Sequence, residues 1–174
     1  MKKILLLSDS HGHIDNNIIK HAKWSDEVWH AGDIGNINVI DCLKKHSLVR
    51  AVYGNIDDHI TRTIFSENIF FKCENFPVLI THIGGYPERY SKRVPSLITK
   101  YKPKLFISGH SHILKIIQDR KYNLLHLNPG ASGIIGFHQK RTMVRFEIDD
   151  KTIKNIFVID LGNRSSINGS DLMT

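Results

Sequence analysis

The first half of the chain alternates apolar runs with amphipathic segments. The apolar runs predict strands at 3–8, 27–31 and 48–53, and the spacing of apolar positions between them predicts helices at 14–22 and 37–46. The first strand contains four consecutive apolar residues, which is expected where both faces of a sheet are covered. The alternation of strands and helices with short connections predicts a parallel sheet flanked by helices.

Shorter apolar runs in the second half predict paired strands. We place them at 69–73, 78–81, 105–108, 113–118, 124–128, 141–148 and 153–161, with turns at 75–77 and 119–121 and a glycine-rich loop at 129–136. The strands from 113 onward have the order of a meander, and the alternation over 142–148 is typical of a half-buried strand. An interior proline costs a helix about 3 kcal/mol. In the connection 84–104 we therefore expect a helix that begins at Pro95.

The length of 174 residues fits one domain, which we place at 1–162, followed by a polar C-terminal tail at 163–174. Cys42 and Cys73 form no CxxC pair and fall in apolar-periodic stretches, so we expect buried, reduced thiols and a cytoplasmic location. The apolar run at the start is shorter than a signal peptide needs, and no segment approaches the roughly 20 apolar residues of a membrane span. We expect no membrane partner.

The net charge of +7 favours anionic substrates and leaves contact with nucleic acid open, although we do not favour it. The densest basic stretch is 89–104, preceded by Glu88. It has two interpretations, a solvated helix face or a phosphate-binding strip. We favour the first, because no aromatic platform accompanies the charges. The sequence also leaves a homo-oligomer open.

Five short polar groups each follow an apolar run that predicts a strand. They are Asp9-Ser10-His11, Gly32-Asp33, Gly54-Asn55, Thr81-His82 and Gly109-His110-Ser111-His112. Open α/β sheets bind ligands at the carboxyl ends of their strands, so these groups are expected to converge. A single Gly-Asp or Gly-Asn serves as an ordinary turn in many proteins, but five groups in this order favour a common site.

These groups resemble, motif by motif and in the same order, the D-x-H, G-D, G-N, lone His and G-H-x-H motifs of the calcineurin-like metallophosphoesterase superfamily. The small size and the form of the third motif, Gly54-Asn55-Ile56-Asp57, look like the compact prokaryotic phosphodiesterase branch. A retromer subunit of the same fold is related to that branch. The resemblance implies an α/β fold, a four-layer αββα sandwich of two mixed β-sheets flanked by helices.

The resemblance also implies a site with two divalent metal ions. One ion would be held by Asp9, His11, Asp33 and His112, and the other by Asp33, Asn55, His82 and His110. Asp33 would bridge the ions, and Asp33, Asn55 and His82 are the catalytic candidates. The set holds imidazole, carboxylate and amide ligands without a thiolate, which suits manganese, our first choice, and is also compatible with iron, zinc, nickel or cobalt.

The implied activity is that of a metal-dependent phosphoesterase. It would hydrolyse a small anionic phosphodiester, with a metal-bridging hydroxide as the nucleophile. Many members of the superfamily follow the ligand Asn with a His that protonates the leaving group, whereas this chain has Ile56. Substrates with acidic leaving groups, such as aryl or nucleotide esters, should therefore react best, unless His59 or a water substitutes. We expect Asp57 to orient a ligand.

The sequence also gives expectations for the histidines outside the motifs and for two alternative functions. The remaining histidines are His13, His21, His30, His46, His59, His126 and His138, and we expect most of them to be surface or core residues. His30 should pack beneath the site, whereas His13 and His59 follow the motifs closely enough to touch substrate. The segment 128–130 is equally a loop that borders the site or a plain turn. A noncatalytic scaffold for protein–protein contacts would be marked by degraded ligands, and a nuclease or nucleic-acid-binding protein is suggested by the charge alone.

Overall fold

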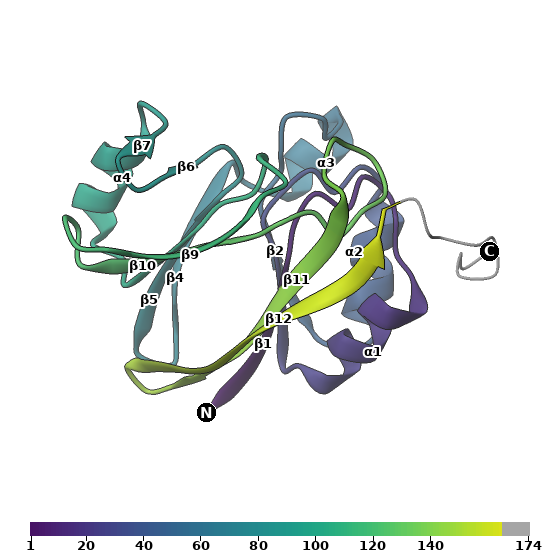
Figure 1. Cartoon of the computed structure of the whole chain (residues 1–174), viewed down its shortest axis with the longest axis horizontal. Helices are drawn as coiled ribbons and strands as arrows, with labels where there is room; N and C mark the ends of the chain where they lie inside the picture. The colour runs from purple at the N-terminus through teal and green to yellow at the C-terminus, as the bar shows by residue number, and fades with distance from the viewer. Residues whose placement is uncertain (165–174) are drawn as a thin grey trace.

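The computed structural model describes residues 1–164, which form two five-stranded sheets that face each other (Figure 1). The first sheet has the order β12-β11-β1-β2-β3 and the second has the order β4-β5-β8-β10-β9. The strands of the first sheet are β1 (Lys2–Leu7), β2 (Glu27–His30), β3 (Leu48–Ala51), β11 (Lys140–Asp149) and β12 (Thr152–Asn163). Those of the second are β4 (Asn68–Cys73), β5 (Phe76–Thr81), β8 (Leu105–Ile107), β9 (Leu114–Asp119) and β10 (Leu124–Pro129).

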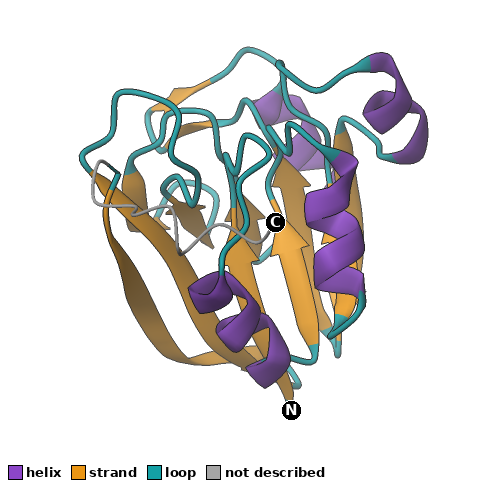
Figure 2. Ribbon diagram, turned by 90° about the vertical axis from the view of Figure 1, so that its right-hand side faces the viewer, coloured by secondary structure: helices purple, strands orange, loops and turns teal. Residues whose placement is uncertain are grey.

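Helices cover the outer face of each sheet. The helices α1 (Asn16–Trp24) and α2 (Ile37–Lys44) pack on the first sheet, and α4 (Val94–Tyr101) packs on the second. Figure 2 shows α1 and α2 in front of the strands, with loops gathered at the edge toward which the strand arrows point. The order of layers is therefore helix, sheet, sheet, helix. The four-layer αββα sandwich of mixed sheets that the resemblance implied is confirmed.

The buried faces of β1 explain its unbroken apolar run. Ile4 and Leu6 belong to the core between the two sheets, together with Trp29, whereas Leu5 and Leu7 belong to the core under α1 and α2. Successive side chains of a strand point to opposite faces, so a strand covered on both sides is apolar throughout. This strand therefore holds the residues that follow it firmly in place.

The structure corrects several expected boundaries. The first helix begins at Asn16 rather than 14, because the Asp15 carboxylate accepts from the Ile18 N–H and caps the helix. The second helix ends at Lys44 rather than 46, and Pro95 is the second rather than the first residue of α4. The expected turn at 75–77 is wrong, because Phe76 already pairs with Cys73 and begins β5. The turn lies at 74–75, where Glu74 has a positive φ of 54°.

One helix and one two-stranded hairpin were missed, and the expected order of the later strands was wrong. The helix α3 (His59–Ile64) and the hairpin of β6 (Gly85–Tyr86) and β7 (Arg89–Tyr90) lie in segments without a clear periodic pattern. The expected meander is wrong: β10 pairs with β8 as well as β9, and β11 crosses to the first sheet, where it lies beside β1. The glycine-rich loop between β10 and β11 connects the second sheet to the first. The proposed tail at 163–174 overlaps the end of β12 at Asn163, and its residues 165–174 lie outside the described part.

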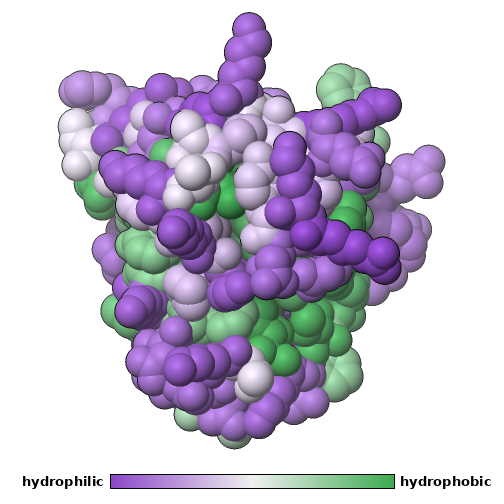
Figure 3. All heavy atoms as spheres, turned by 90° about the vertical axis from the view of Figure 1, so that its left-hand side faces the viewer, coloured by the Kyte–Doolittle hydropathy of each residue, from purple (hydrophilic) through white to green (hydrophobic). Residues whose placement is uncertain are grey.

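Seen from the side of α4, the surface is mostly hydrophilic, with apolar side chains concentrated toward its lower part (Figure 3). In the basic stretch, Lys92, Lys100, Lys102 and Lys104 are exposed, in agreement with a solvated face. Cys42 and Cys73 are free thiols, but only Cys73 is fully buried. Within residues 1–164, no helix has the length and apolar character needed to cross a bilayer.

Candidate metal centre

The candidate ligands lie where strands of both sheets end. Asp9, Asp33 and Asn55 follow β1, β2 and β3, which run parallel in the first sheet. His82 and His110 follow β5 and β8, which run parallel in the second. The structure brings all the polar groups of the sequence to one rim, because parallel strands present their carboxyl ends at the same edge.

The backbone is unusual at five of the seven candidate ligands. Asp9 (52°), His11 (48°), Asp33 (53°), His110 (68°) and His112 (57°) have positive φ angles. Residues other than glycine rarely adopt this left-handed conformation, and where they do it concentrates at functional sites. The turns aim these side chains inward at the cost of local strain. The backbone at the rim therefore differs from that of ordinary loops, in which such residues rarely adopt this conformation.

The side chains form two adjoining groups. Within each group, the candidate ligand atoms all lie within 4.8 Å of one another. The first group is Asp9, His11 and His112, and the second is Asp33, His82 and His110. Asp33 lies between them: its Oδ1 is 3.2 Å from His82 Nε2, and its Oδ2 is 3.9 Å from His11 Nε2. The Asn55 side chain adjoins the second group, with its Oδ1 3.1 Å from His82 Nε2. This grouping is the one that the resemblance implies for two ions bridged by Asp33.

His82 has oxygen atoms gathered around one ring nitrogen. Its Nδ1 lies 2.8 Å from the Ala31 carbonyl, which can only accept, so Nδ1 carries a proton. Its Nε2 then faces carboxylate oxygens of Asp33 and Asp9 as well as the Asn55 amide oxygen. Burial lowers the pKa of His82, but Asp33 and Asp9 outweigh it and raise the pKa. Such a position calls for a positive charge, either a proton or a metal cation.

A buried oxygen of Asp9 has no hydrogen-bond partner. Asp9 Oδ2 accepts from the His110 N–H at 3.1 Å, whereas Oδ1 is buried and unpartnered. The atom nearest to this oxygen among the ion-pair contacts is His112 Nε2, at 3.2 Å. An unpaired buried carboxylate oxygen is costly, so its position is explained by a cation between these two atoms. The residues present therefore fit a divalent metal.

His138 orients His112 through a chain of hydrogen bonds. His138 Nε2 lies 3.0 Å from the Gly133 carbonyl, so it carries the proton and leaves His138 Nδ1 as an acceptor. The facing atom, 3.1 Å away, is His112 Nδ1, which must then be the donor. The lone pair of His112 is left on Nε2, which points toward Asp9. A metal ligand needs this tautomer.

The Asp57 carboxylate joins two ligand-bearing loops. It accepts from the Gly35 N–H through Oδ1 and from the Gly54 N–H through Oδ2, each at 2.7 Å. A Cβ on Gly54 would collide with Asp33, which explains the glycine of this motif. Asp57 thus holds the backbone of the loops that carry Asp33 and Asn55. The expected contact to a ligand side chain is replaced by contacts to main-chain amides.

Two more buried residues support the ligand loops. Asn128 Nδ2 donates to the Gly109 carbonyl at 2.8 Å and to Ser111 Oγ at 3.2 Å, so the segment 128–130 borders the Gly-His-Ser-His loop and is more than a plain turn. His30 packs beneath the site, as expected. Its Nδ1 accepts from the Gly32 N–H and its Nε2 donates to Ser10 Oγ at 2.8 Å. Burial lowers the pKa of His30 to about 4, so its ring is neutral at pH 7.

Arg141 anchors the floor of the site and was missed by sequence reasoning. It is 2% exposed, donates from Nη2 to Asp15 Oδ2 at 2.7 Å and from Nε to the Ser132 carbonyl at 2.8 Å. Ser132 in turn donates through its N–H and Oγ to the Ser8 carbonyl. The guanidinium therefore ties α1 and the loop after β10 to the residue before Asp9. His13 is buried in this cluster, where its Nε2 lies 3.2 Å from Asp15 Oδ2, so its ring faces Asp15 and not an open surface.

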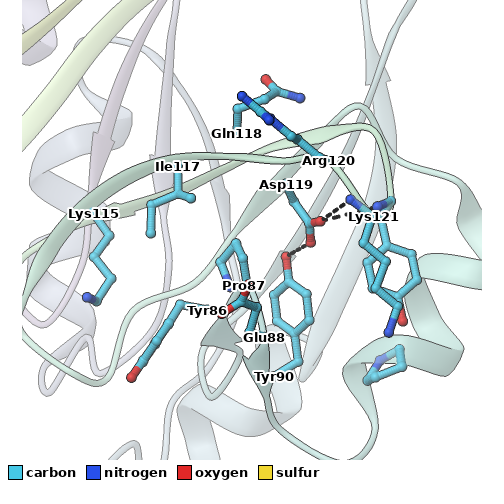
Figure 4. Close-up of a pocket in the computed structure, with 12 residues that line it drawn as sticks. Tyr86, Pro87, Glu88, Tyr90, Lys115, Ile117, Gln118, Asp119, Arg120 and Lys121 are labelled. Carbon is cyan, nitrogen blue, oxygen red and sulfur yellow. Dashed lines mark hydrogen bonds between the residues drawn. The ribbon is translucent and has the colours of Figure 1, made fainter.

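A separate cleft of about 560 Å³ lies between the β6–β7 hairpin and β9 (Figure 4). The Tyr90 hydroxyl donates to Asp119 Oδ2 at 2.6 Å, and Asp119 Oδ1 accepts from the backbone N–H groups of Lys121 and Tyr122. Burial and the neighbouring carboxylate raise the pKa of Tyr90, which keeps the hydroxyl protonated. These contacts fix the turn after β9 against the hairpin. The cleft contains none of the seven candidate ligands.

A four-layer sandwich with carboxylate and imidazole side chains clustered at its strand ends has the architecture of a metallophosphoesterase. Residues 1–151 match the family described as "Calcineurin-like phosphoesterase superfamily domain". The chain therefore belongs to the calcineurin-like phosphoesterase superfamily, a family of metal-dependent hydrolases.

Three similar proteins agree with this assignment. A probable metallophosphoesterase of Methanothermobacter thermautotrophicus is 27% identical over 106 residues, which are 60% of this chain and 59% of that protein. The matching part thus spans less than two thirds of that relative. A single mutant of Vps29 from Entamoeba histolytica has a TM-score of 0.69 at 17% identity, with coverage of 92% of this chain and 99% of that chain. A novel archaeal phosphodiesterase has a TM-score of 0.67 at 20% identity, with coverage of 90% and 99%. The two structures establish the likeness of the fold.

Proposed function

We propose that the protein is a phosphodiesterase that holds two divalent cations, with manganese as the first choice, on Asp9, His11, Asp33, Asn55, His82, His110 and His112. The observation that carries this proposal is the convergence of both ligand groups on Asp33, beside a buried Asp9 oxygen without a partner. When bound, the cations would supply an activated water as the attacking hydroxide and charge stabilisation for the phosphoryl oxygens.

Three of the protein's own side chains would orient the site. Asp33 would hold the two ligand groups in register, and Asn55 and His82 face the same point beside it. Burial disfavours the charged form of Asp33, but the contact with His82 outweighs burial and lowers the pKa of the carboxyl. Asp33 is therefore ionised at neutral pH and ready to act as a ligand. The same residues are the proposed catalytic group.

The leaving group would depart without a protein acid at the position after Asn55. Ile56 lines the cleft at the site and is 47% exposed there, whereas His59 begins α3 and does not line that cleft. A positioned general acid contributes roughly 10²- to 10⁴-fold to rate. We therefore expect esters with acidic leaving groups to react best.

The test is hydrolysis of matched aryl phosphates by the protein with Mn²⁺. A bis-aryl phosphodiester should be cleaved with a kcat/KM about tenfold or more above that of the corresponding monoester, because only the diester carries a second arm to contact the apolar cleft beside Ile56. Faster cleavage of the monoester, or no cleavage of either compound, would contradict the proposal.

His138 provides a second test, which measures metal binding directly. Replacing His138 with alanine should weaken Mn²⁺ binding about 10- to 100-fold, because His112 loses the acceptor that fixes its tautomer. His46→Ala, at an exposed position after α2, is the matched control and should bind as the unmodified protein does. Calorimetric titration with MnCl₂ measures both variants. Equal Mn²⁺ affinities of the His138→Ala and His46→Ala variants would show that His138 does not support metal binding through His112.

The scaffold function remains the second candidate, on the likeness in fold to Vps29. The completeness of the ligand set favours the enzyme, since a scaffold would not require two clustered ligand groups or a buried Asp9 oxygen without a partner. A nuclease or nucleic-acid-binding role, a homo-oligomer and a cytoplasmic location stay predictions of the sequence. Free thiols at Cys42 and Cys73 are compatible with that location.

A further inference from the structure

Two clefts of different chemistry meet at Asn55. The first, of about 410 Å³, adjoins His11 and His112 and is lined on its apolar side by Ile56, Ile113 and Phe137. We call it the apolar cleft. The second, of about 170 Å³, adjoins His82 and is lined by Tyr53, Arg62, Glu67, Ile83 and Arg93. We call it the arginine cleft. The apolar cleft also reaches Asp33 and His110, so it contacts both ligand groups, whereas the arginine cleft contacts only His82 of these groups. Asn55 belongs to both clefts.

The apolar cleft exposes large side chains that a soluble surface normally avoids in a cluster. Phe137 is fully exposed, and Ile56 and Ile113 are 47% and 56% exposed. They come from three loops, after β3, β8 and β10, so no single amphipathic element accounts for them. Apolar side chains gathered around polar ligands are typical of a cleft that binds an apolar or planar group.

The arginine cleft presents two guanidinium groups held in place. Arg62 stacks on the Tyr53 ring at 4.9 Å and donates from Nη2 to the Asn55 carbonyl at 2.8 Å. Arg93 donates to Thr81 Oγ1 at 2.7 Å and pairs with Glu67, the one carboxylate lining this cleft. Two positive charges against one negative charge leave a cationic cleft beside His82. Fixed arginines are well suited to bind carboxylate or phosphate oxygens.

We propose that the substrate is an asymmetric phosphodiester, with one planar or apolar arm in the apolar cleft and a second arm that carries a further anionic group in the arginine cleft. This inference rests on the proposed phosphodiesterase function and adds the class of its substrate. The reacting phosphate would lie across Asn55, where the two clefts meet. Arg93, which the basic stretch of the sequence contains, thus becomes a substrate-binding residue, while its lysine neighbours remain solvated.

The test compares two diesters with the same leaving group, 4-nitrophenyl ethyl phosphate and 4-nitrophenyl 2-carboxyethyl phosphate. The carboxylate compound should have a KM about fivefold lower, since a single partly exposed ion pair contributes of that order, and the preference should shrink in high salt. Arg93→Gln should abolish the preference. Glu67→Gln should increase it, because the competing carboxylate is removed from Arg93.

The apolar cleft is tested by Phe137→Ala, which should raise the KM of both compounds alike. Phe157→Ala is the matched control, because Phe157 is a half-exposed phenylalanine on β12 that lines neither cleft. Calorimetry with non-hydrolysable phosphonate analogues of the two diesters should show tighter binding of the carboxylate analogue to the unmodified protein, to Phe137→Ala and to Phe157→Ala, and equal binding of the two analogues to Arg93→Gln. Equal affinity for the two analogues in the unmodified protein, or a preference retained in Arg93→Gln, would overturn the inference. Failure to hydrolyse either diester would count against the proposed function. The calorimetry would still show whether the arginine cleft prefers an anionic arm.

Discussion

Replacing Asp33 with asparagine is expected to lower kcat for phosphodiester hydrolysis by about 10³-fold or more. The two oxygens of Asp33 face different ligand groups, with Oδ1 3.2 Å from His82 Nε2 and Oδ2 3.9 Å from His11 Nε2. An amide keeps the shape and tolerates the left-handed backbone at φ 53°, but it offers one neutral oxygen in place of a charged pair. The loss would then reflect the missing charge, which stabilises the cations that the reaction needs.

The control for this experiment is Asp150→Asn. Asp150 also has a positive φ, of 50°, but it is exposed in the turn between β11 and β12, remote from the ligand loops. The same chemical change in the same backbone conformation should leave kcat within about twofold. A folded Asp33→Asn variant with the kcat of the unmodified protein would contradict the bridging role of this carboxylate.

Replacing Arg141 with methionine is expected to lower the free energy of unfolding by about 3 to 5 kcal/mol. Methionine fills much of the same volume but leaves the Asp15 carboxylate, which is 4% exposed, without its cationic partner. Breaking a buried ion pair from one side is among the costly single substitutions. Urea unfolding followed by circular dichroism measures the change.

Two further variants separate the effect of the unpaired charge from other effects of the substitution. Lys140→Met removes a surface ion pair from the adjacent residue, which is 58% exposed, and should cost less than about 1 kcal/mol. Arg141→Met combined with Asp15→Asn removes both charges and should recover part of the loss. A double variant no more stable than Arg141→Met alone would place the effect in packing rather than in the unpaired carboxylate.

The same pair predicts how stability depends on pH. Burial alone would raise the pKa of Asp15, but hydrogen bonds from His13, from the Ile18 N–H and from Arg141 outweigh it, so the pKa lies well below its usual range. A carboxyl whose pKa is lower in the folded state stabilises the protein above its unfolded pKa of about 3.9, and this contribution is lost as the pH falls toward the folded value. Between neutral and acid pH, the Arg141→Met variant should therefore lose less free energy of unfolding than the unmodified protein loses.

The sequence predicted those strands and helices whose pattern of apolar residues is sufficient to identify them. The unbroken run at 4–7 required a strand covered on both faces, and the structure places Ile4 and Leu5 in different cores. The order β10-β8 and the crossing of β11 to the first sheet were not predictable from local pattern, because strand pairing depends on contacts far apart in the chain. The hairpin β6–β7 has only two residues per strand and leaves no periodic signal.

The convergence of the candidate ligands was predictable from the sequence, whereas the residues that support them were not. The five motifs gave the ligand candidates, since His, Asp and Asn at successive strand ends share one rim. The left-handed backbone at Asp9 or His112 leaves no mark in the sequence, because both residue types also occur in ordinary conformations. His138 and Arg141 were missed because their partners, His112 and Asp15, lie far away in the chain. The only hint was an arginine at the first position of the expected strand 141–148.

Anomalous diffraction from crystals grown with Mn²⁺ tests the central claim most directly. The account predicts two manganese peaks about 3.5 to 4 Å apart. One should lie among Asp9, His11 and His112 and the other among Asn55, His82 and His110, with the Asp33 carboxylate touching both. A single peak, or manganese bound at other side chains while this rim holds none, would contradict it.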